Sequence, residues 1–272
     1  MVSISRRALL TGGAAVAVTG AVGVGGWVAA PGSVKYRIKE ELGLNPDPYV
    51  PDVPSGLIQV ERVASEAMGE VRLFTAVPDG FGDGAGLPVL VVLHGASASV
   101  DDFAGFGFGQ FATAIAQEGL PMVLAGTDDG PNGWLPDGVV DPFRMLTDEL
   151  PGWLAERGFA AERRGLWGWS RGGYGALAFA ETHPDWMRAL ALFSPALHEG
   201  DDLVRGLDPL ADVPVGIWCG DDDAFLDGAK DVAAHLPRPA EVESYGDGGH
   251  TRQYWNGQTM PMLRWAGANL AS

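Results

Sequence analysis

Ser170 stands in a glycine-rich pattern that is typical of a serine nucleophile. The segment Gly168-Trp-Ser-Arg-Gly172 overlaps the end of an apolar run of strand type, Gly165–Trp169, and leads into a helix expected over Arg171–Thr182. A strand, a sharp turn and a helix in this order present the serine hydroxyl at the turn, and the flanking glycines leave room for it. The pattern therefore predicts Ser170 as the nucleophile of an acyl transfer. The alternative is a plain glycine turn.

A serine hydroxyl needs a neighbouring base, and His250 is the best placed of the five histidines. With this kind of turn the chain order is nucleophile, acid, base, so the histidine should follow Ser170. His198, His235 and His250 do so, but only His250 lies in a loop between the last predicted strand and the last predicted helix. We therefore predict His250 as the general base; the alternative is a histidine of a surface loop.

The acid that orients this base is expected among three consecutive aspartates, Asp221, Asp222 and Asp223, which follow the predicted strand Val215–Cys219. Three adjacent carboxylates cannot all be buried without raising their pKa values, so one should face the histidine and the others water. The spacing Gly-x-x-Asp from Gly220 selects Asp223, and Asp222 is the alternative. The cluster has no further ligands in register for a cation, and no metal site is predicted.

Two backbone amides should stabilise the oxyanion that forms when a serine attacks an ester. One is the amide of Arg171, which follows the nucleophile. The other is expected from the turn after the strand Val89–Leu93, where Ala96 is the predicted donor. His94, which opens this turn, is predicted to be structural.

Two tryptophans are candidates for contact with a substrate. Trp134 lies in the loop 128–141, and Trp169 directly precedes Ser170. A core position is the alternative for both, because most tryptophans of a chain pack in its interior.

From Gly56 onward, strand-length apolar runs alternate with helix-length stretches, which predicts an α/β protein with a mostly parallel sheet and helices on both faces. In such sheets the active-site residues gather at the carboxyl ends of the strands. The strands are expected at Leu57–Ala64, Val71–Val77, Val89–Leu93, Met122–Ala125, Gly165–Trp169, Ala189–Phe193, Val215–Cys219 and Val242–Ser244. The helices are expected at Phe111–Glu118, Asp148–Arg157, Arg171–Thr182, Gly228–His235 and Gln253–Asn269.

These segments together resemble the putative-esterase family of α/β-hydrolases, which contains esterase D, the S-formylglutathione hydrolases and the antigen 85 mycolyltransferases. The likeness covers residues 87–265 and rests on five segments: Thr147–Leu154, Gly168–Leu177, His183–Pro195, Gly220–Leu226 and His250–Trp255. The resemblance implies an α/β-hydrolase fold without a large lid domain. It also implies a serine esterase with Ser170, Asp223 and His250 as catalytic triad and with no cofactor.

Three other functions remain open at this stage. The family resemblance also implies an acyltransferase of the mycolyltransferase type as an alternative. Arg171 departs from the family pattern, because the family commonly has methionine at this position. A serine peptidase would need a lid or propeller domain that the chain has no room for, and a binding protein would normally have lost a member of the triad. The expected substrate is a small-molecule, lipid or carbohydrate ester; the sequence does not indicate an oligomeric state.

The first thirty residues have the composition of an export signal. Arg6 and Arg7 precede a stretch from Ala8 to Val34 without any charged residue, which predicts a signal peptide of the twin-arginine type over residues 1–30. The alternative is an uncleaved anchor formed by residues 8–30, which would be the only membrane contact. The protein is thus expected to be periplasmic, cell-wall-associated or secreted. Residues 31–55 carry five prolines and are predicted to be an extended strap, and residues 56–272 to be the catalytic domain.

Charge and cysteine content exclude further classes. The 272 residues contain 18 Lys and Arg against 35 Asp and Glu, a formal charge of −17, which disfavours nucleic acid as a partner. The single cysteine, Cys219, can form neither an intramolecular disulfide nor a multi-cysteine zinc site. Cys219 ends a predicted strand and is expected to be inert.

Overall fold

The computed structural model describes residues 47–96 and 98–271. The predicted signal or anchor, residues 1–30, and the first part of the predicted strap lie outside the described residues. The described residues all belong to one compact unit, so the described part of the strap lies in the same unit as the predicted catalytic domain. Within the described ranges, no helix is both long and apolar enough to cross a membrane.

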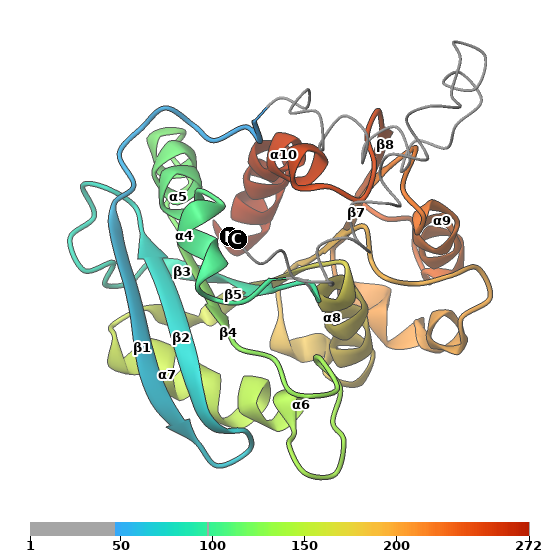
Figure 1. Cartoon of the computed structure of the whole chain (residues 1–272), viewed down its shortest axis with the longest axis horizontal. Helices are drawn as coiled ribbons and strands as arrows, with labels where there is room; N and C mark the ends of the chain where they lie inside the picture. Colours follow the sequence, from blue (N-terminus) through green and yellow to red (C-terminus); the bar gives the residue numbers. More distant parts are fainter. Residues whose placement is uncertain (1–46, 97, 272) are drawn as a thin grey trace, which may run out of the picture. The chain divides into compact units, whose positions relative to one another are not determined.

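A single eight-stranded sheet forms the centre of this unit (Figure 1). Its strands are β1 (Leu57–Ser65), β2 (Gly69–Val77), β3 (Pro88–Leu93), β4 (Val123–Thr127), β5 (Ala160–Trp169), β6 (Leu190–Phe193), β7 (Val215–Gly220) and β8 (Val242–Gly246). They lie in the order β1-β2-β4-β3-β5-β6-β7-β8. The β1–β2 and β2–β4 pairs are antiparallel and all other pairs are parallel. The predicted mostly parallel sheet is therefore confirmed.

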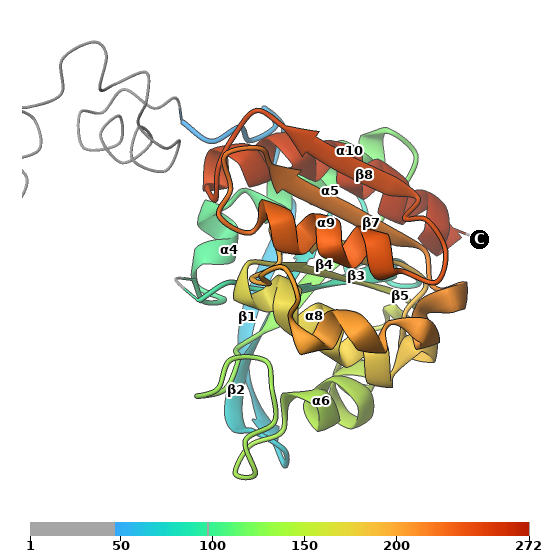
Figure 2. The same ribbon diagram turned by 90° about the vertical axis from the view of Figure 1, so that its right-hand side faces the viewer.

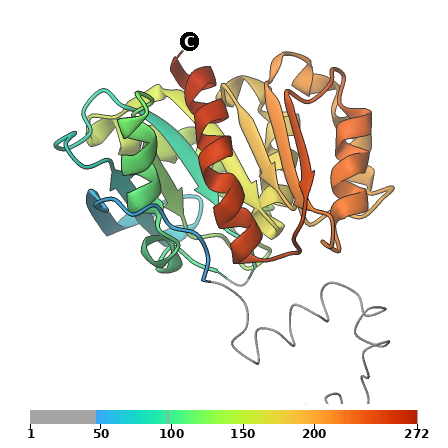
Figure 3. The same ribbon diagram turned by 90° about the horizontal axis from the view of Figure 1, so that it is seen from above.

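Helices cover both faces of the sheet, as predicted. Helices α5 and α10 pack on one face (Figure 3), and α7, α8 and α9 pack on the other (Figure 2). The α-helices are α4 (Asp102–Gly105), α5 (Phe108–Gln117), α6 (Pro142–Arg144), α7 (Leu150–Glu156), α8 (Arg171–Thr182), α9 (Leu226–His235) and α10 (Arg252–Ala271). A π-helical turn, η1 (Met145–Glu149), joins α6 to α7, and the 3₁₀ turns are η2 (Pro184–Trp186), η3 (Asp202–Gly206) and η4 (Asp208–Asp212).

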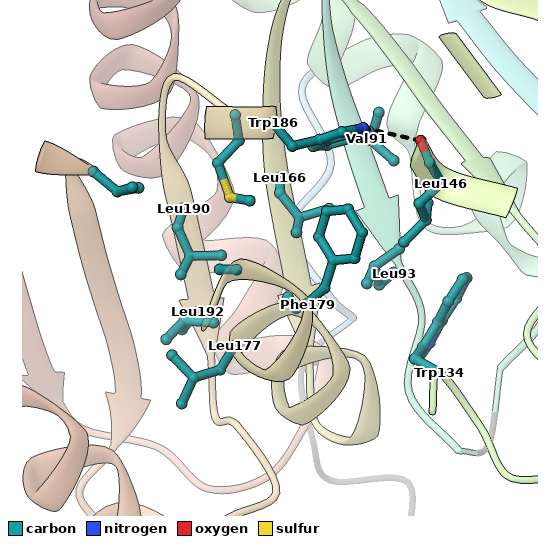
Figure 4. Close-up of a cluster of buried hydrophobic side chains, with 14 of the residues drawn as sticks. Val91, Leu93, Trp134, Leu146, Leu166, Leu177, Phe179, Trp186, Leu190 and Leu192 are labelled. Carbon is teal, nitrogen blue, oxygen red and sulfur yellow. Dashed lines mark hydrogen bonds between the residues drawn. The ribbon is translucent and has the colours of Figure 1, made fainter. Parts of the chain in front are cut away.

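The two faces of the sheet carry two separate hydrophobic cores because successive side chains of a strand point to opposite sides. In β5, Leu166 faces α8 and packs near Phe179, while Trp167 and Trp169 face α5 and α10. Figure 4 shows the core on the α8 face, where the indole Nε1 of Trp186 donates to the carbonyl of Leu146 at 2.9 Å. Because apolar side chains fill both faces of the sheet, the polar candidate site residues lie at the edge where the parallel strands end.

Two elements begin three or more residues earlier than the sequence predicts. Helix α5 starts at Phe108 instead of Phe111, because Gly107, with a φ of 89°, begins the helix from a left-handed conformation. Strand β5 starts at Ala160 instead of Gly165, because it follows the edge of β3 from Pro88 onward. The charged residues 162–164 interrupt the apolar run there, so the pattern alone placed the strand start too late.

The described part of the strap crosses α5 and α10 before it enters β1 (Figure 1). The ring of Tyr49 lies edge-on to Phe111 at 6.1 Å, and a Cβ on Gly107 would approach Val50 Cγ1 to 2.7 Å. The side-chain amide of Asn256, in α10, donates to two carbonyls, those of Tyr49 at 2.7 Å and of Phe106 at 3.1 Å. One buried side chain thus joins the strap, the last helix and the turn before α5.

Cys219 is expected to be unreactive in the folded protein. Its side chain is fully buried at the end of β7, and this burial raises the pKa of the thiol to about 12. Almost no thiolate therefore exists near neutral pH, and the sulfur is inaccessible. We expect no reaction with Ellman's reagent at about pH 8 in the native protein and one equivalent after denaturation. Fast labelling of the native protein would contradict the placement of Cys219.

Candidate active site

The turn after β5 holds Ser170 in a conformation that serine rarely adopts. Its φ is 56°, and its amide donates to the carbonyl of Phe193 at 2.9 Å. A Cβ on Gly172 would lie 2.0 Å from the carbonyl oxygen of Leu93, and one on Gly168 would lie 2.2 Å from that of Gly172. Only glycine fits at these two positions, so the G-x-S-x-G pattern has the strand, turn and helix context that the sequence predicts.

Ser170, His250 and Asp223 meet at the carboxyl ends of β5, β7 and β8. The Nε2 atom of His250 lies 2.9 Å from Ser170 Oγ. Its Nδ1 atom lies 3.1 and 3.0 Å from the two carboxylate oxygens of Asp223. The structure thus brings the three predicted residues into one hydrogen-bonded line, in which Nδ1–H donates to the carboxylate and Nε2 accepts from the hydroxyl.

The structure distinguishes Asp223 from Asp222. The side chain of Asp223 is fully buried and faces His250, whereas Asp221 and Asp222 are exposed. A further donor, the amide of Phe225, lies 3.0 Å from Asp223 Oδ1. The buried carboxylate of Asp223 therefore has protein hydrogen-bond partners in place of water.

The loop that carries His250 is tied to the turn that carries the acid. The amide of Asp222 donates to the carbonyl of Gly248 at 2.9 Å, and the amide of Gly248 donates to Asp221 Oδ1 at 3.2 Å. A Cβ on Gly220 would lie 2.2 Å from the Gly248 carbonyl oxygen. The two loops therefore touch backbone to backbone, which fixes the distance between Asp223 and His250.

The two predicted oxyanion donors lie at the ends of neighbouring strands β3 and β5. The first backbone bond of α8 runs from Tyr174 to the carbonyl of Ser170, so the amide of Arg171 has no partner within the helix. Ala96 lies in the turn after β3 and is exposed. His94, in the same turn, is 2% exposed, and its Nδ1 lies 3.0 Å from the carbonyl of Gly95. This burial agrees with the structural role predicted for His94.

The two tryptophans predicted to contact substrate lie in different surroundings. Trp134 is only 1% exposed, its Nε1 donates to the carbonyl of His94 at 2.9 Å, and it packs on Gly175 of α8. It therefore supports the turn after β3 from inside the core, and this placement does not favour a substrate contact. The loop 128–141 folds the indole inward, as in the core position that was the alternative.

Trp169 lines a small cavity beside the triad. The other lining residues are Phe106, Phe108, Trp167, Arg252, Trp255, Asn256 and Thr259. The space open to a water-sized molecule is about 10 Å³, which is room for one water. The guanidinium of Arg252, one of the lining residues, lies 4.6 Å from the centre of the Phe106 ring. Among the described residues, no three His, Cys, Asp or Glu side chains cluster as a metal site would require.

Residues 65–266 match the profile of the Putative esterase family. This chain belongs to that family. Two curated relatives share about a third of their aligned residues with it. The MPT51 antigen of Mycobacterium leprae is 33% identical over 126 residues, which cover 45% of this chain and 40% of that protein. The Putative esterase NocK of Nocardia uniformis subsp. tsuyamanensis is 32% identical over 164 residues, which cover 56% and 45%. The matches therefore span less than half the length of these relatives.

Solved structures of the same architecture include several esterases. A ferulic acid esterase superposes with a TM-score of 0.70 at 19% identity, over 82% of this chain and all of that one. An S-formylglutathione hydrolase from Agrobacterium tumefaciens gives a TM-score of 0.64 at 17% identity, over 79% and 96%. At these identities the likeness establishes the fold, and the predicted α/β-hydrolase fold is thereby confirmed.

In this member of the Putative esterase family, Arg171 is held by an acidic partner. Its guanidinium forms an ion pair with Asp129, which follows β4, and its Cδ packs against Gly133, where a Cβ would approach it to 2.8 Å. Asp129 also lies 3.8 Å from Nε2 of His94. The charge of Arg171 is thus balanced locally, although the side chain remains partly exposed at the edge of the site.

The sequence did not single out three residues that lie around His250: Ser194, Phe225 and Trp255. Phe225 and Trp255 place their rings 5.1 and 4.9 Å from the imidazole of His250. Ser194 bonds to the indole of Trp255. The available signals were the aromatic residues just after the acid and the histidine, and a serine that ends β6 as Ser170 ends β5.

The close approach of Gly172 to β3 predicts a large effect of a single methyl group. Gly172→Ala should lower the free energy of unfolding by about 2 kcal/mol or more, because its Cβ has no space beside Leu93. Gly152→Ala is the matched control, since Gly152 is an exposed helical glycine of α7 with open space around it. That change should raise stability by about 0.5–1 kcal/mol. Urea unfolding measures both, and equal effects would contradict the packing of the turn.

Proposed function

We propose that the protein is an exported serine esterase that hydrolyses carboxylic esters through an acyl-enzyme intermediate. The observation that carries the proposal is the continuous line from Ser170 Oγ through His250 to the buried carboxylate of Asp223, with distances of 2.9 to 3.1 Å. A hydroxyl, an imidazole and a carboxylate in this order are the elements of a catalytic triad. Membership of the Putative esterase family supports an ester as substrate.

In the first half of the reaction, Ser170 Oγ attacks the ester carbonyl carbon while its proton moves to His250 Nε2. Asp223 accepts the Nδ1–H bond, keeps the imidazole in the productive tautomer and stabilises the imidazolium that forms. The carbonyl oxygen becomes an oxyanion, for which the amides of Arg171 and Ala96 are the proposed donors. The first turn of α8 adds the positive end of a helix dipole next to Ser170.

Collapse of this intermediate breaks the ester C–O bond, and the imidazolium gives its proton to the leaving alcohol. Water then attacks the acyl-Ser170 carbonyl while His250 takes its proton. The second tetrahedral intermediate collapses with cleavage of the acyl–Oγ bond, the imidazolium returns the proton to Ser170 Oγ, and the carboxylic acid leaves. The His250 side chain is 31% exposed, so water reaches the base directly. Such exposure favours hydrolysis over transfer to an alcohol, which requires that water be kept out.

The proposed export rests on Arg6, Arg7 and the uncharged stretch that follows them. We propose that this segment directs the protein out of the cytoplasm, either as a cleaved signal or as a retained anchor. Acyl transfer to an alcohol is the second outcome of the same acyl-enzyme. Incubation with an ester and an alcohol acceptor distinguishes the two reactions, because hydrolysis yields the free acid and transfer yields a new ester.

Removal of the nucleophile tests the proposal most directly. We expect Ser170→Ala to lower kcat/KM for a short p-nitrophenyl ester by about 10⁴-fold or more, because no other described group can form the acyl-enzyme. The wild-type protein should also react with a fluorophosphonate, and the adduct should be found on Ser170 by peptide mass spectrometry. The far-UV circular dichroism of the variant should match that of the wild type. Unchanged turnover by the folded variant would refute the assignment.

The three neighbouring aspartates offer a matched pair of variants for the acid. Asp223→Asn should lower kcat by about 10³–10⁴-fold, because an amide neither stabilises the imidazolium nor selects its tautomer. Asp222→Asn makes the same chemical change one residue away, on an exposed side chain, and should leave kcat within about 2-fold. Steady-state kinetics on one ester measures both. Equal losses in the two variants would show that local charge, and not the contact with His250, accounts for the effect.

A further inference from the structure

Ser194 shares an unusual backbone conformation with Ser170. In residues 47–96 and 98–271 these two serines are the only non-glycine residues with positive φ, at 42° and 56°. Both follow parallel strands that lie side by side, β6 and β5, and each donates its amide to the next strand along the sheet. A serine in this strained backbone conformation persists only where the surrounding structure holds it, and such residues cluster at functional sites.

The hydroxyl of Ser194 is buried and has a defined partner. The residue is fully inaccessible, and its Oγ accepts a hydrogen bond of 3.0 Å from Nε1 of Trp255. Nε1 is the only polar atom of the indole, so this bond fixes how the ring is turned. Because Trp255 is in the first turns of α10, the bond links the end of β6 to the helix that follows His250.

The indole held in this way lies against the imidazole of His250. The two ring centres are 4.9 Å apart and the ring planes are nearly perpendicular, at 86°. Phe225 makes a second edge contact with His250, at 5.1 Å and 67°. His250 is partly exposed, so these ring contacts and the bond to Asp223 together restrict rotation of the imidazole away from its 2.9 Å contact with Ser170.

We propose that Ser194 and Trp255 act as one positioning unit for His250. The Ser194 hydroxyl orients the indole, and the indole holds the imidazole in line with Ser170. The inference rests on the proposed function, because it assigns these residues a role in the work of the triad. Neither residue exchanges a proton or forms a bond with the substrate in this scheme.

The chain offers variants that isolate each part of the unit. Ser194→Gly removes the acceptor, and glycine adopts the positive φ without strain, so the backbone of this variant should keep its conformation. Trp255→Phe keeps an aromatic ring but lacks the N–H donor. Trp265→Phe is the control, because Trp265 lies on the same helix and donates to Glu241 at 3.0 Å, away from His250.

We expect Ser194→Gly and Trp255→Phe each to lower kcat for a short p-nitrophenyl ester by about 10-fold, with KM within about 2-fold of the wild type. The double variant should lose about 10-fold as well, instead of the roughly 100-fold that independent effects would give, because both changes break one bond. Trp265→Phe should keep wild-type kcat. A loss that lies in KM would instead make Trp255 part of the substrate wall and overturn the proposal.

Two further outcomes would also overturn it: wild-type kcat in Ser194→Gly, or multiplicative losses in the double variant. Reaction of the wild-type protein with a fluorophosphonate at Ser170 separates this inference from the proposed function. If the wild type neither reacts nor hydrolyses esters, the proposed function itself fails. If the wild type is active and the variants behave as independent, only the positioning unit is refuted.

Discussion

The backbone contact between the start of α8 and the end of β3 is the constraint on which the site depends. Gly172 lies against the carbonyl of Leu93 with no space for a side chain. This contact brings the turn after β5 next to the turn after β3, so Ser170, the proposed nucleophile, and the proposed oxyanion donors belong to one rigid corner. The strained φ of Ser170 is a consequence of the same corner, because the chain must turn from strand to helix within one residue.

The parallel sheet extends this arrangement to the other members of the proposed triad. Strands β5, β6, β7 and β8 are neighbours in this order and all end at the same edge. The acid follows β7 and the histidine follows β8, and the contacts between their loops set the spacing of Asp223 and His250. Ser170 and His250, which are 80 positions apart in the chain, are thereby brought within hydrogen-bond distance by the sheet itself.

The sequence predicts those parts of the site that depend on local pattern. The predicted start of α8 at Arg171 is confirmed, because a serine between glycines after a buried strand is typical of a sharp turn that leads directly into a helix. Asp223 could be preferred to Asp222 from spacing alone, and the structure brings Asp223 to His250. The contact between Ser194 and Trp255 could not be predicted, since it joins residues 61 positions apart and carries no local signature. Trp134 illustrates the same limit, because a polar loop does not reveal which of its side chains folds inward.

Asn256 joins three segments that lie far apart in the sequence. Its amide holds the carbonyl of Tyr49, ahead of the first strand, and that of Phe106, ahead of α5, while the residue itself belongs to the last helix. A mechanical force applied to the chain at residue 47 would therefore act through Asn256 on α10 and on the turn at Phe106. It would act on the hairpin of β1 and β2 only afterwards. Tension applied to a tethered domain would reach the wall of the cavity beside His250 first, and the outer strands of the sheet later.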